Sequence, residues 1–338
     1  MPWNFLNFFI KDNGLYSIII GIVILLVLIV WRKITISKIK DSVVCQQAAE
    51  LRDRDKLIIL RDLYEVKIFK QMVDKSKVII IGVHGLQGQK EDFKLLSAFC
   101  KKSQLSLISY DRRGIGKNAC FSKFKSLGTD INDLKDVINV VKTKYPNQKI
   151  VVFGESLGAA IASYAVKNNP QVEALIISNL VTKRNLAQYS LSFVFRYGFA
   201  FLFNSKIEMP IFIDNQDISS SKAHITNMNQ RYNVRQNWSL RFFLQFKKIN
   251  KNSINIISNL KQQTLILQSA DDVFSDFHQL KINHKYWKSQ HNYVFLFEGK
   301  HALINEPSIK ALFDKEIMPW MAKNINIQKG PTNNEINP

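Results

Sequence analysis

Two shortages in the sequence exclude whole classes of protein. Only 3 of the 338 residues are cysteine (Cys45, Cys100 and Cys120), too few for a disulfide framework and without metal-site spacing. They are typical of buried thiols in a reducing compartment. Long apolar runs are equally scarce, because a single run is long enough to cross a membrane, and this excludes a polytopic membrane protein. Hydrophobic residues nevertheless make up 46% of the chain, enough for a core, which excludes a disordered protein.

Acidic residues are a third shortage. The 27 Asp and Glu face 47 Lys and Arg, a formal net charge of +20. Such an excess raises nucleic acid as a partner, but the basic residues are scattered singly and no zinc-ligand spacing or RNA-binding motif accompanies them. We therefore predict no specific nucleic-acid binding. A basic surface beside an anionic membrane explains the charge better, since each Lys or Arg near such a membrane contributes about 1 kcal/mol of attraction to it.

The one long apolar run is residues 15–31, LYSIIIGIVILLVLIVW, which contains no charge. As a helix it reaches about 26 Å, close to the roughly 30 Å hydrocarbon core of a bilayer. Tyr16 and Trp31 stand at its two ends, where amphipathic rings favour the membrane interface. We predict an uncleaved transmembrane helix over 15–31, preceded by an interfacial segment over 1–14. A cleaved signal peptide is the alternative, although the basic start and small-residue cleavage site that it needs are missing.

The charges that flank this run indicate an orientation. Lys11 and Asp12 precede it, and a basic group follows it closely: Arg32, Lys33, Lys38 and Lys40. The positive-inside rule then places the rest of the chain on the cytoplasmic side of a single-pass membrane protein.

Beyond the run, apolar strand patterns alternate with helical ones. Residues 32–60 predict a charged helical connector, and residues 61–323 a single folded domain. The strands are expected at 64–69, 78–83, 105–110, 150–153, 174–177, 264–267 and 293–297, and helices at 131–144, 159–166 and 308–321. This alternation predicts an α/β fold with a mostly parallel sheet flanked by helices.

Two segments break the alternation. Residues 180–260 are rich in aromatics and too long for a plain loop, so we predict a helical cap inserted over the carboxyl ends of the strands. Residues 324–338 are polar and rich in Asn, Pro and Gly, which predicts a disordered tail.

The strongest local motif is Gly154-Glu155-Ser156-Leu157-Gly158, between the apolar strand KIVVF and the helical AAIASYAV. A serine on a sharp strand-to-helix turn has an exposed hydroxyl, and flanking glycines let the strand and the helix approach closely. The start of the helix also offers free N–H groups to a developing oxyanion. Ser156 is therefore the candidate nucleophile.

A serine nucleophile needs a base, and His301 follows the last predicted strand in FEGKHALINE. His84 competes, but its setting in VHGLQG suits an oxyanion loop better, and the other four histidines are expected at the surface. The orienting acid is expected after the strand at 264–267, where Asp271 and Asp272 are adjacent. Their chemistry alone does not separate them, and Asp276 is a more distant competitor. The chain order is then Ser, Asp, His.

Five segments in this order, VHGLQG, SYDRRGIGKN, VVFGESLGAA, LILQSADDVFSD and FEGKHALINE, resemble the α/β-hydrolase superfamily. They are most similar to its monoacylglycerol lipase and lysophospholipase branch, described as serine aminopeptidase S33-like, over residues 60–322. The resemblance implies Ser156 as nucleophile, His301 as base and Asp272, rather than Asp271, as acid. It also implies an oxyanion hole from the backbone N–H groups of Leu86, which follows His84-Gly85, and of Leu157.

These observations predict a membrane-anchored serine hydrolase that cleaves acyl esters of lipid-like substrates and needs no metal or cofactor. Thioester or peptide hydrolysis is the alternative within the same fold, since a fold does not set the substrate. A non-catalytic scaffold that binds a lipid or a partner is the alternative from another class. The sequence does not determine the oligomeric state.

Overall fold

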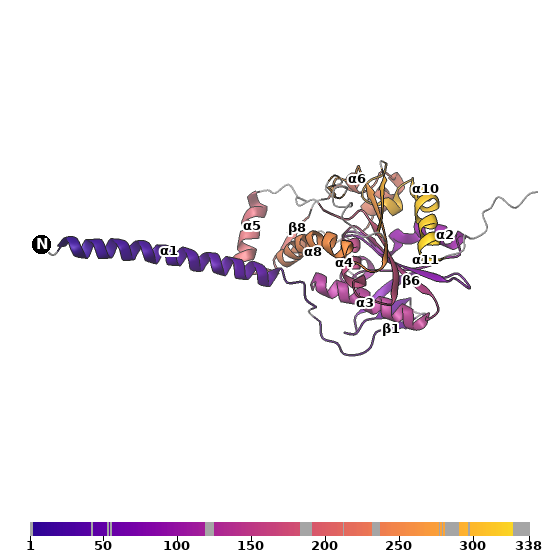
Figure 1. The fold of residues 1–338 in the computed structure, drawn as a ribbon, viewed down its shortest axis with the longest axis horizontal. Coiled ribbons are helices and arrows are strands. Elements are labelled where there is room, and N and C mark those ends of the chain that lie inside the picture. Colours follow the sequence, from indigo (N-terminus) through magenta and orange to yellow (C-terminus); the bar gives the residue numbers. More distant parts are fainter. Residues whose placement is uncertain are drawn as a thin grey trace, which may run out of the picture.

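The computed structural model describes residues 3–41, 43–52, 54, 56–118, 125–182, 191–211, 213–231, 237–276, 278, 280, 291–296 and 298–326. Within them, one nine-stranded sheet forms the centre of the folded body, with helices on both faces, and helix α1 projects away from it (Figure 1). This architecture is the predicted α/β-hydrolase fold with a helical insertion and one apolar N-terminal helix.

The strands pair in the order β1-β2-β3-β5-β4-β6-β7-β10-β11. From β5 to β11 all pairings are parallel, whereas β1, β2 and β3 add an antiparallel edge. Their bounds are β1 (Glu50–Arg52), β2 (Leu57–Ile59), β3 (Glu65–Gln71), β4 (Val78–Val83), β5 (Ser106–Tyr110), β6 (Lys149–Glu155), β7 (Val172–Ser178), β10 (Gln263–Ser269) and β11 (His291–Leu296). Each of the seven predicted strands is present.

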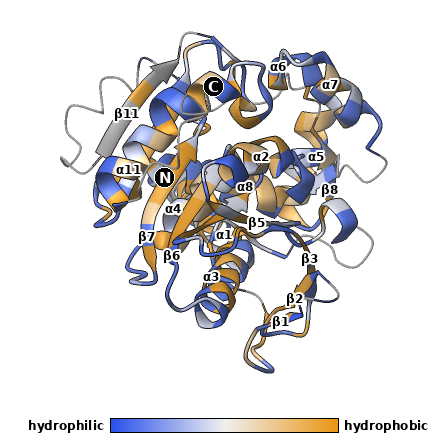
Figure 2. Cartoon of the chain, turned by 90° about the vertical axis from the view of Figure 1, so that its right-hand side faces the viewer, coloured by the Kyte–Doolittle hydropathy of each residue, from blue (hydrophilic) through white to orange (hydrophobic). Residues whose placement is uncertain are grey.

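Two apolar layers cover the two faces of the sheet. Along β4, Ile79 and Ile81 point into one layer, whereas Val78 and Ile80 point into the other, as the period of two in a strand requires. This double burial explains why the central strands are apolar throughout (Figure 2). The first layer packs against α3 (Leu127–Lys144), α4 (Leu157–Val166) and α8 (Leu240–Ser258), and the second against α2 (Lys94–Lys102), α10 (Ile309–Leu312) and α11 (Met318–Ile325).

The predicted helical connector is wrong over most of its length. Helix α1 (Trp3–Ile36) continues a short way past the apolar run, but the chain then enters strands β1 and β2. The residues of β2 are all buried and β-branched or leucine, and they complete the edge of the sheet. Burial against the sheet therefore overrides the helical propensity of the preceding charged residues.

The cap is mainly helical, as predicted. It holds α5 (Leu191–Leu202), α6 (Asn215–Ile218), α7 (Lys222–Asn229) and the start of α8, together with a small antiparallel pair, β8 (Glu208–Pro210) and β9 (Asn237–Ser239). The later part of α8 belongs to the core, because Ile249 and Ile257 are fully buried in the layer that contains α4.

Among the described residues, α1 is the one helix long and apolar enough to cross a membrane, over Ile18–Ile36. It is continuous for 34 residues, about 51 Å at 1.5 Å per residue, and so exceeds the predicted span at both ends. A signal sequence near the N-terminus would pass the same test of length and composition.

Two further expectations change. The predicted disordered tail begins too early, because α11 continues to Ile325, and residues 327–338 lie outside the described residues. The cysteines are not uniformly buried: Cys100 is buried, Cys45 is exposed, and Cys120 lies outside the described residues.

Candidate active site

Ser156 stands on the turn between β6 and α4, with φ 57° and ψ −123°, a conformation that non-glycine residues rarely adopt. The two glycines of the motif make this turn possible. A Cβ on Gly154 would lie 2.6 Å from the Gly158 carbonyl oxygen, and one on Gly158 would lie 2.1 Å from that of Val83. The turn therefore holds the Ser156 side chain at the carboxyl edge of the sheet, where strand β6 ends.

His301 and Asp272 come to this serine from other strand ends. His301 follows β11, Asp272 follows β10, and both side chains are buried. His301 Nδ1 is 2.9 Å from both Asp272 carboxylate oxygens, and Nε2 is 2.7 Å from Ser156 Oγ. Since a carboxylate only accepts, Nδ1 carries the proton and Nε2 accepts from the serine hydroxyl. The Phe274 ring packs edge-on against the imidazole, 4.7 Å between centroids.

The structure distinguishes the two adjacent aspartates. Asp272 accepts hydrogen bonds from the Phe274 N–H (2.9 Å) and the Ser275 hydroxyl (2.6 Å) as well as from His301. Burial by itself would raise the pKa of Asp272, but the electrostatic interaction with His301 and these hydrogen bonds hold its pKa below the usual value. Asp271 is exposed, and its backbone N–H donates to Ser269 Oγ.

The loop after β4 brings Leu86 beside the serine. Gly85 lies so close that an added Cβ would be 3.0 Å from Ser156 Cβ. The Gly85 carbonyl accepts from Arg112 Nη2 (2.8 Å) and from His84 Nδ1 (2.9 Å). Because C=O and N–H point in opposite directions across a trans peptide, this anchored carbonyl directs the Leu86 N–H away from Arg112. Leu157 supplies the first N–H of α4, which has no partner within the helix.

His84 is held as a neutral ring and does not contact the serine hydroxyl. Its Nε2 accepts from the Arg112 backbone N–H at 3.0 Å, and its Nδ1 donates to Gly85. Burial, followed by the positive charge of Arg112, lowers its pKa well below the usual value. Arg112 is in turn buried and paired with Asp130 at 2.9 Å. These bonds make His84 and Arg112 supports of the loop.

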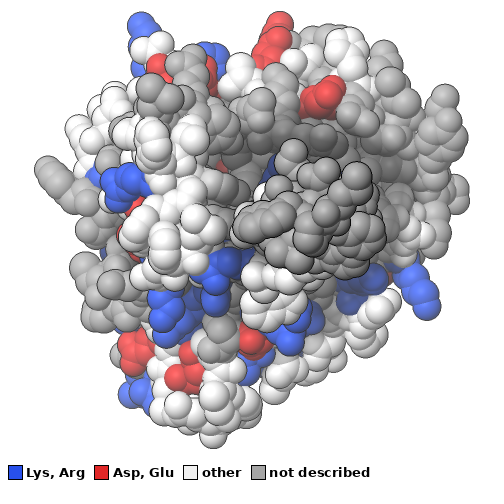
Figure 3. Space-filling view, turned by 90° about the vertical axis from the view of Figure 1, so that its left-hand side faces the viewer, with Lys and Arg blue, Asp and Glu red and all other residues white. Residues whose placement is uncertain are grey.

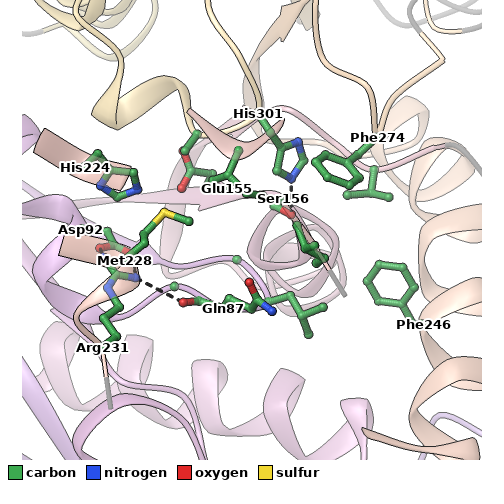
Figure 4. A pocket seen from close by; sticks show the side chains of 17 residues that line it. Gln87, Asp92, Glu155, Ser156, His224, Met228, Arg231, Phe246, Phe274 and His301 are labelled. Atoms are coloured by element: carbon green, nitrogen blue, oxygen red, sulfur yellow. Dashed lines mark hydrogen bonds and ion pairs between the residues drawn. The ribbon is translucent and has the colours of Figure 1, made fainter. Parts of the chain in front are cut away.

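Ser156 and His301 line a cavity. It has about 610 Å³ of empty space, and part of that space is open to solvent. Its walls differ in character (Figure 4). Phe274 and Phe246 lie on one side of the serine, and Asp92, His224 and Arg231 lie on the other. The cap adds four apolar side chains to the lining: Val181, Ile213, Ile218 and Met228. The rest of the lining comes from the core: Gly85, Leu86, Gln87, Gly88, Glu155 and Ala302.

Sequence reasoning missed the polar wall. Arg231, from the cap, forms an ion pair with Asp92 of the core and donates to the Gln87 carbonyl at 3.2 Å. His224 was expected at the surface, but it is half-buried and lines the cavity. The surface expectation was wrong because contacts across the cap, far apart in sequence, decide its burial.

Glu155 is the other missed residue, although it lies inside the GxSxG motif. Its side chain is buried and lines the cavity. Burial, and next the negative charge of Asp92, raise the pKa of Glu155 to about 8. A neutral carboxyl group therefore stands beside the serine at neutral pH. Its position next to the nucleophile was the only sequence feature that could have drawn attention to it.

Comparison with protein families identifies the family of this chain. The family described as serine aminopeptidase, S33, matches residues 74–308, which contain all five motifs. The chain belongs to this family. A search of curated proteins finds no match for this S33-family chain.

Solved structures share the fold of this S33-family chain at low sequence identity. The monoacylglycerol lipase of Paleococcus ferrophilus aligns with a TM-score of 0.65 and 14% identity, over 77% of this chain and 100% of that one. A soluble variant of the monoglyceride lipase of Saccharomyces cerevisiae aligns with a TM-score of 0.66 and 16% identity, over 85% and 97%. A carboxyl esterase of Bacillus coagulans gives 0.63 and 14%, over 82% and 99%.

Proposed function

We propose that this chain is a membrane-anchored serine hydrolase that cleaves acyl esters of lipid-like substrates. The observation that carries the proposal is the chain of hydrogen bonds from Ser156 through His301 to Asp272 at the edge of a partly open cavity. A serine hydroxyl becomes a useful nucleophile when an oriented imidazole takes its proton.

In the proposed reaction, Ser156 Oγ attacks the ester carbonyl while His301 Nε2 takes its proton. The backbone N–H groups of Leu86 and Leu157 stabilise the oxyanion. His301 then protonates the departing alcohol, which leaves an acyl-enzyme. Water, deprotonated by His301, releases the acid. Asp272 stabilises the imidazolium at both stages, and its lowered pKa keeps it ionised for this role.

The two walls of the cavity favour an amphipathic ester. The apolar wall offers Phe246, Phe274 and aliphatic side chains to an acyl chain, and the polar wall offers Asp92 and Arg231 to the alcohol. Two structural relatives are lipases of monoacylglycerol, which supports the same substrate class. A thioesterase domain from the curacin pathway also shares the fold, with a TM-score of 0.55, and keeps thioesters as the second candidate.

The anchoring helix of the proposal is α1. Its apolar side chains from Ile18 to Val30 are mostly exposed among the residues that the structure describes, and a bilayer would cover them. The basic residues that follow favour a hydrolase body on the cytoplasmic side.

Labelling with a fluorophosphonate probe tests the activated serine. We expect wild-type protein to be labelled, and Ser156→Ala and His301→Ala to lose the label. Ser163→Ala is the matched control, because Ser163 is a buried serine of α4 whose hydroxyl donates to the Ala160 carbonyl. A panel of monoacylglycerols, lysophospholipids and acyl thioesters then identifies the substrate. If folded wild-type protein takes up no label, the proposal of an enzyme is refuted and the alternative of a lipid-binding scaffold remains.

A further inference from the structure

Helix α5 carries apolar side chains on two opposite faces, with Arg196 between them. One face packs into a small cluster with the start of α8, through Phe193, Tyr197 and Ala200. The opposite face presents Phe195, Phe199 and Leu202, whose exposed fractions are 77%, 57% and 55%. A helix with apolar residues on two opposite faces is stable when both faces are covered. The structure covers one face and leaves the other bare.

This bare face adjoins the proposed anchor. Helix α5 stands across α1 near its C-terminal end (Figure 1). Arg32 Nε of α1 donates to the Phe201 carbonyl of α5, and Ile36 is buried in the cluster that holds Ala200. Trp31, close to this junction, is 62% exposed. The exposed apolar side chains of α1 and α5 therefore meet at one corner of the molecule.

Positive charge surrounds the junction. Residues 29–40, 191–211 and 237–248 meet there and carry nine basic residues against one acidic residue, Glu208. The basic residues are Arg32, Lys33, Lys38, Lys40, Arg196, Lys206, Arg241, Lys247 and Lys248. Several Lys and Arg side chains are visible on the face from which α1 projects (Figure 3).

We infer that α5 lies flat in the headgroup region of an anionic membrane, as a second membrane contact beside α1. The inference rests on the proposed anchoring by α1, because a membrane-spanning α1 fixes how deep α5 lies in the membrane and how α5 is oriented to its surface. A helix that crosses a membrane-spanning helix runs along the membrane surface, where one apolar side sinks into the acyl boundary. The surrounding basic residues attract anionic headgroups, whereas a second copy of this chain would present the same positive charge and be repelled.

This contact gives lipid a short route to the cavity. Helix α5 belongs to the insertion between Val181 and Ile213, and both of these residues line the cavity. On α8, Phe243 packs edge-on against Phe193 of α5 at 5.8 Å, and Phe246 of the same helix lines the cavity. A single helix thus separates the membrane face of the cap from the candidate active site.

Depth-dependent fluorescence quenching on the full chain tests the inference. Cys45 and Cys120 are changed to Ser, and Cys100 stays because it is buried. An environment-sensitive dye is then placed at Phe199→Cys, at Val23→Cys in α1, or at Leu95→Cys. Leu95 is the matched control, an exposed leucine of α2 on the other layer of the sheet. The vesicles contain phosphatidylcholine, phosphatidylserine and a spin-labelled lipid.

We expect quenching at positions 199 and 23 and none at 95. Quenching at 23 without quenching at 199 would overturn the inference and leave the anchor intact. No quenching at 23 would overturn both. Dye at 199 that shifts to the blue without lipid quenching, and more so at high protein density, would show that a second copy covers α5 instead.

A second measurement connects α5 to substrate entry. The double variant Phe195→Ser, Phe199→Ser should hydrolyse an ester carried in vesicles several-fold more slowly than wild type. Its fluorophosphonate labelling should not change, because neither side chain lines the cavity. Leu95→Ser should affect neither readout. An unchanged rate on vesicles would overturn the role of α5 in entry, whereas a wild type inactive on every ester would count against the proposed function.

Discussion

At the scale of single residues, Asp271 and Asp272 are chemically identical neighbours with different surroundings. Asp272 is buried and bonded to His301, whereas Asp271 is exposed. The backbone after β10 decides the difference, because consecutive side chains leave it in different directions. The resemblance of the motif to a known family selected Asp272, but the chemistry of the pair alone could not.

We expect Asp272→Asn to lower kcat about a thousandfold to ten-thousandfold. An amide in place of the carboxylate no longer stabilises an imidazolium and favours the wrong histidine tautomer. Asp271→Asn is the matched control and should remain within about twofold of wild type, as is usual for an exposed position. Steady-state hydrolysis of a soluble short-chain ester measures both variants. Equal losses in the two variants would contradict the assignment of the acid.

Glu155 should make stability depend on pH. Its pKa is raised from an ordinary 4.5 to about 8 by burial, so folding favours the uncharged acid. That contribution is complete below the unfolded pKa and is lost as pH rises through about 8. We expect the free energy of unfolding of wild type to fall by a few kcal/mol from about pH 5 to about pH 9, relative to Glu155→Gln.

Urea denaturation in detergent across this pH range measures the difference. Glu298→Gln is the control, because Glu298 is exposed, and it should leave the pH dependence of wild type unchanged. If the free energies of unfolding of wild type and Glu155→Gln change with pH in parallel, the Glu155 carboxyl does not titrate in this range.

At the scale of secondary-structure elements, the crossing of α4 over β4 holds the candidate nucleophile in place. The helix comes so close to the strand that Gly158 has room for hydrogen alone. We expect Gly158→Ala to destabilise the protein by about 3 kcal/mol or more and to abolish fluorophosphonate labelling, since helix and strand must separate.

The control for this change is Gly198→Ala in α5, where no atom lies within 4 Å of the added methyl group. Alanine is the better helix former by about 1 kcal/mol, so this variant should be neutral or slightly more stable. Denaturant unfolding and labelling follow both variants. A Gly158→Ala protein of normal stability would show that α4 shifts freely.

At the scale of the whole molecule, the chain joins a folded hydrolase body to an exposed apolar helix. We expect full-length protein to stay in the membrane fraction through alkaline carbonate extraction. Ile22→Arg combined with Leu25→Arg should release it, because each arginine at the centre of a span costs about 2.5–3.5 kcal/mol. Leu95→Arg, on the surface of the body, should leave the protein membrane-bound. A mature protein that lacks its first residues by mass spectrometry would contradict the anchor and identify a cleaved signal peptide.

Local patterns were sufficient for most elements of the fold. Strands such as β4 and β6 have apolar side chains on both faces, a pattern typical of strands at the centre of a covered sheet. In α3, the apolar residues recur with the period of a helix. The prediction of a helical connector failed because β1 and β2 are only three residues long and depend on pairing for their stability. Strand β2 pairs with β3, and β1 pairs with β2. A strand that short carries no periodicity of its own.

The sequence alone determined the α/β class, the apolar helix, the serine and the histidine of the candidate site, and the pair of adjacent aspartates that contains its acid. Each can be predicted from a local pattern: the period of the apolar residues, the length of an apolar run, or the type of residue at the end of a strand. Only the tertiary structure decided which aspartate meets His301, that Arg112 holds the Gly85 carbonyl, that Arg231 and His224 of the cap form a polar wall, and that α5 stands beside α1. These depend on contacts between segments far apart in the chain, which no local pattern records.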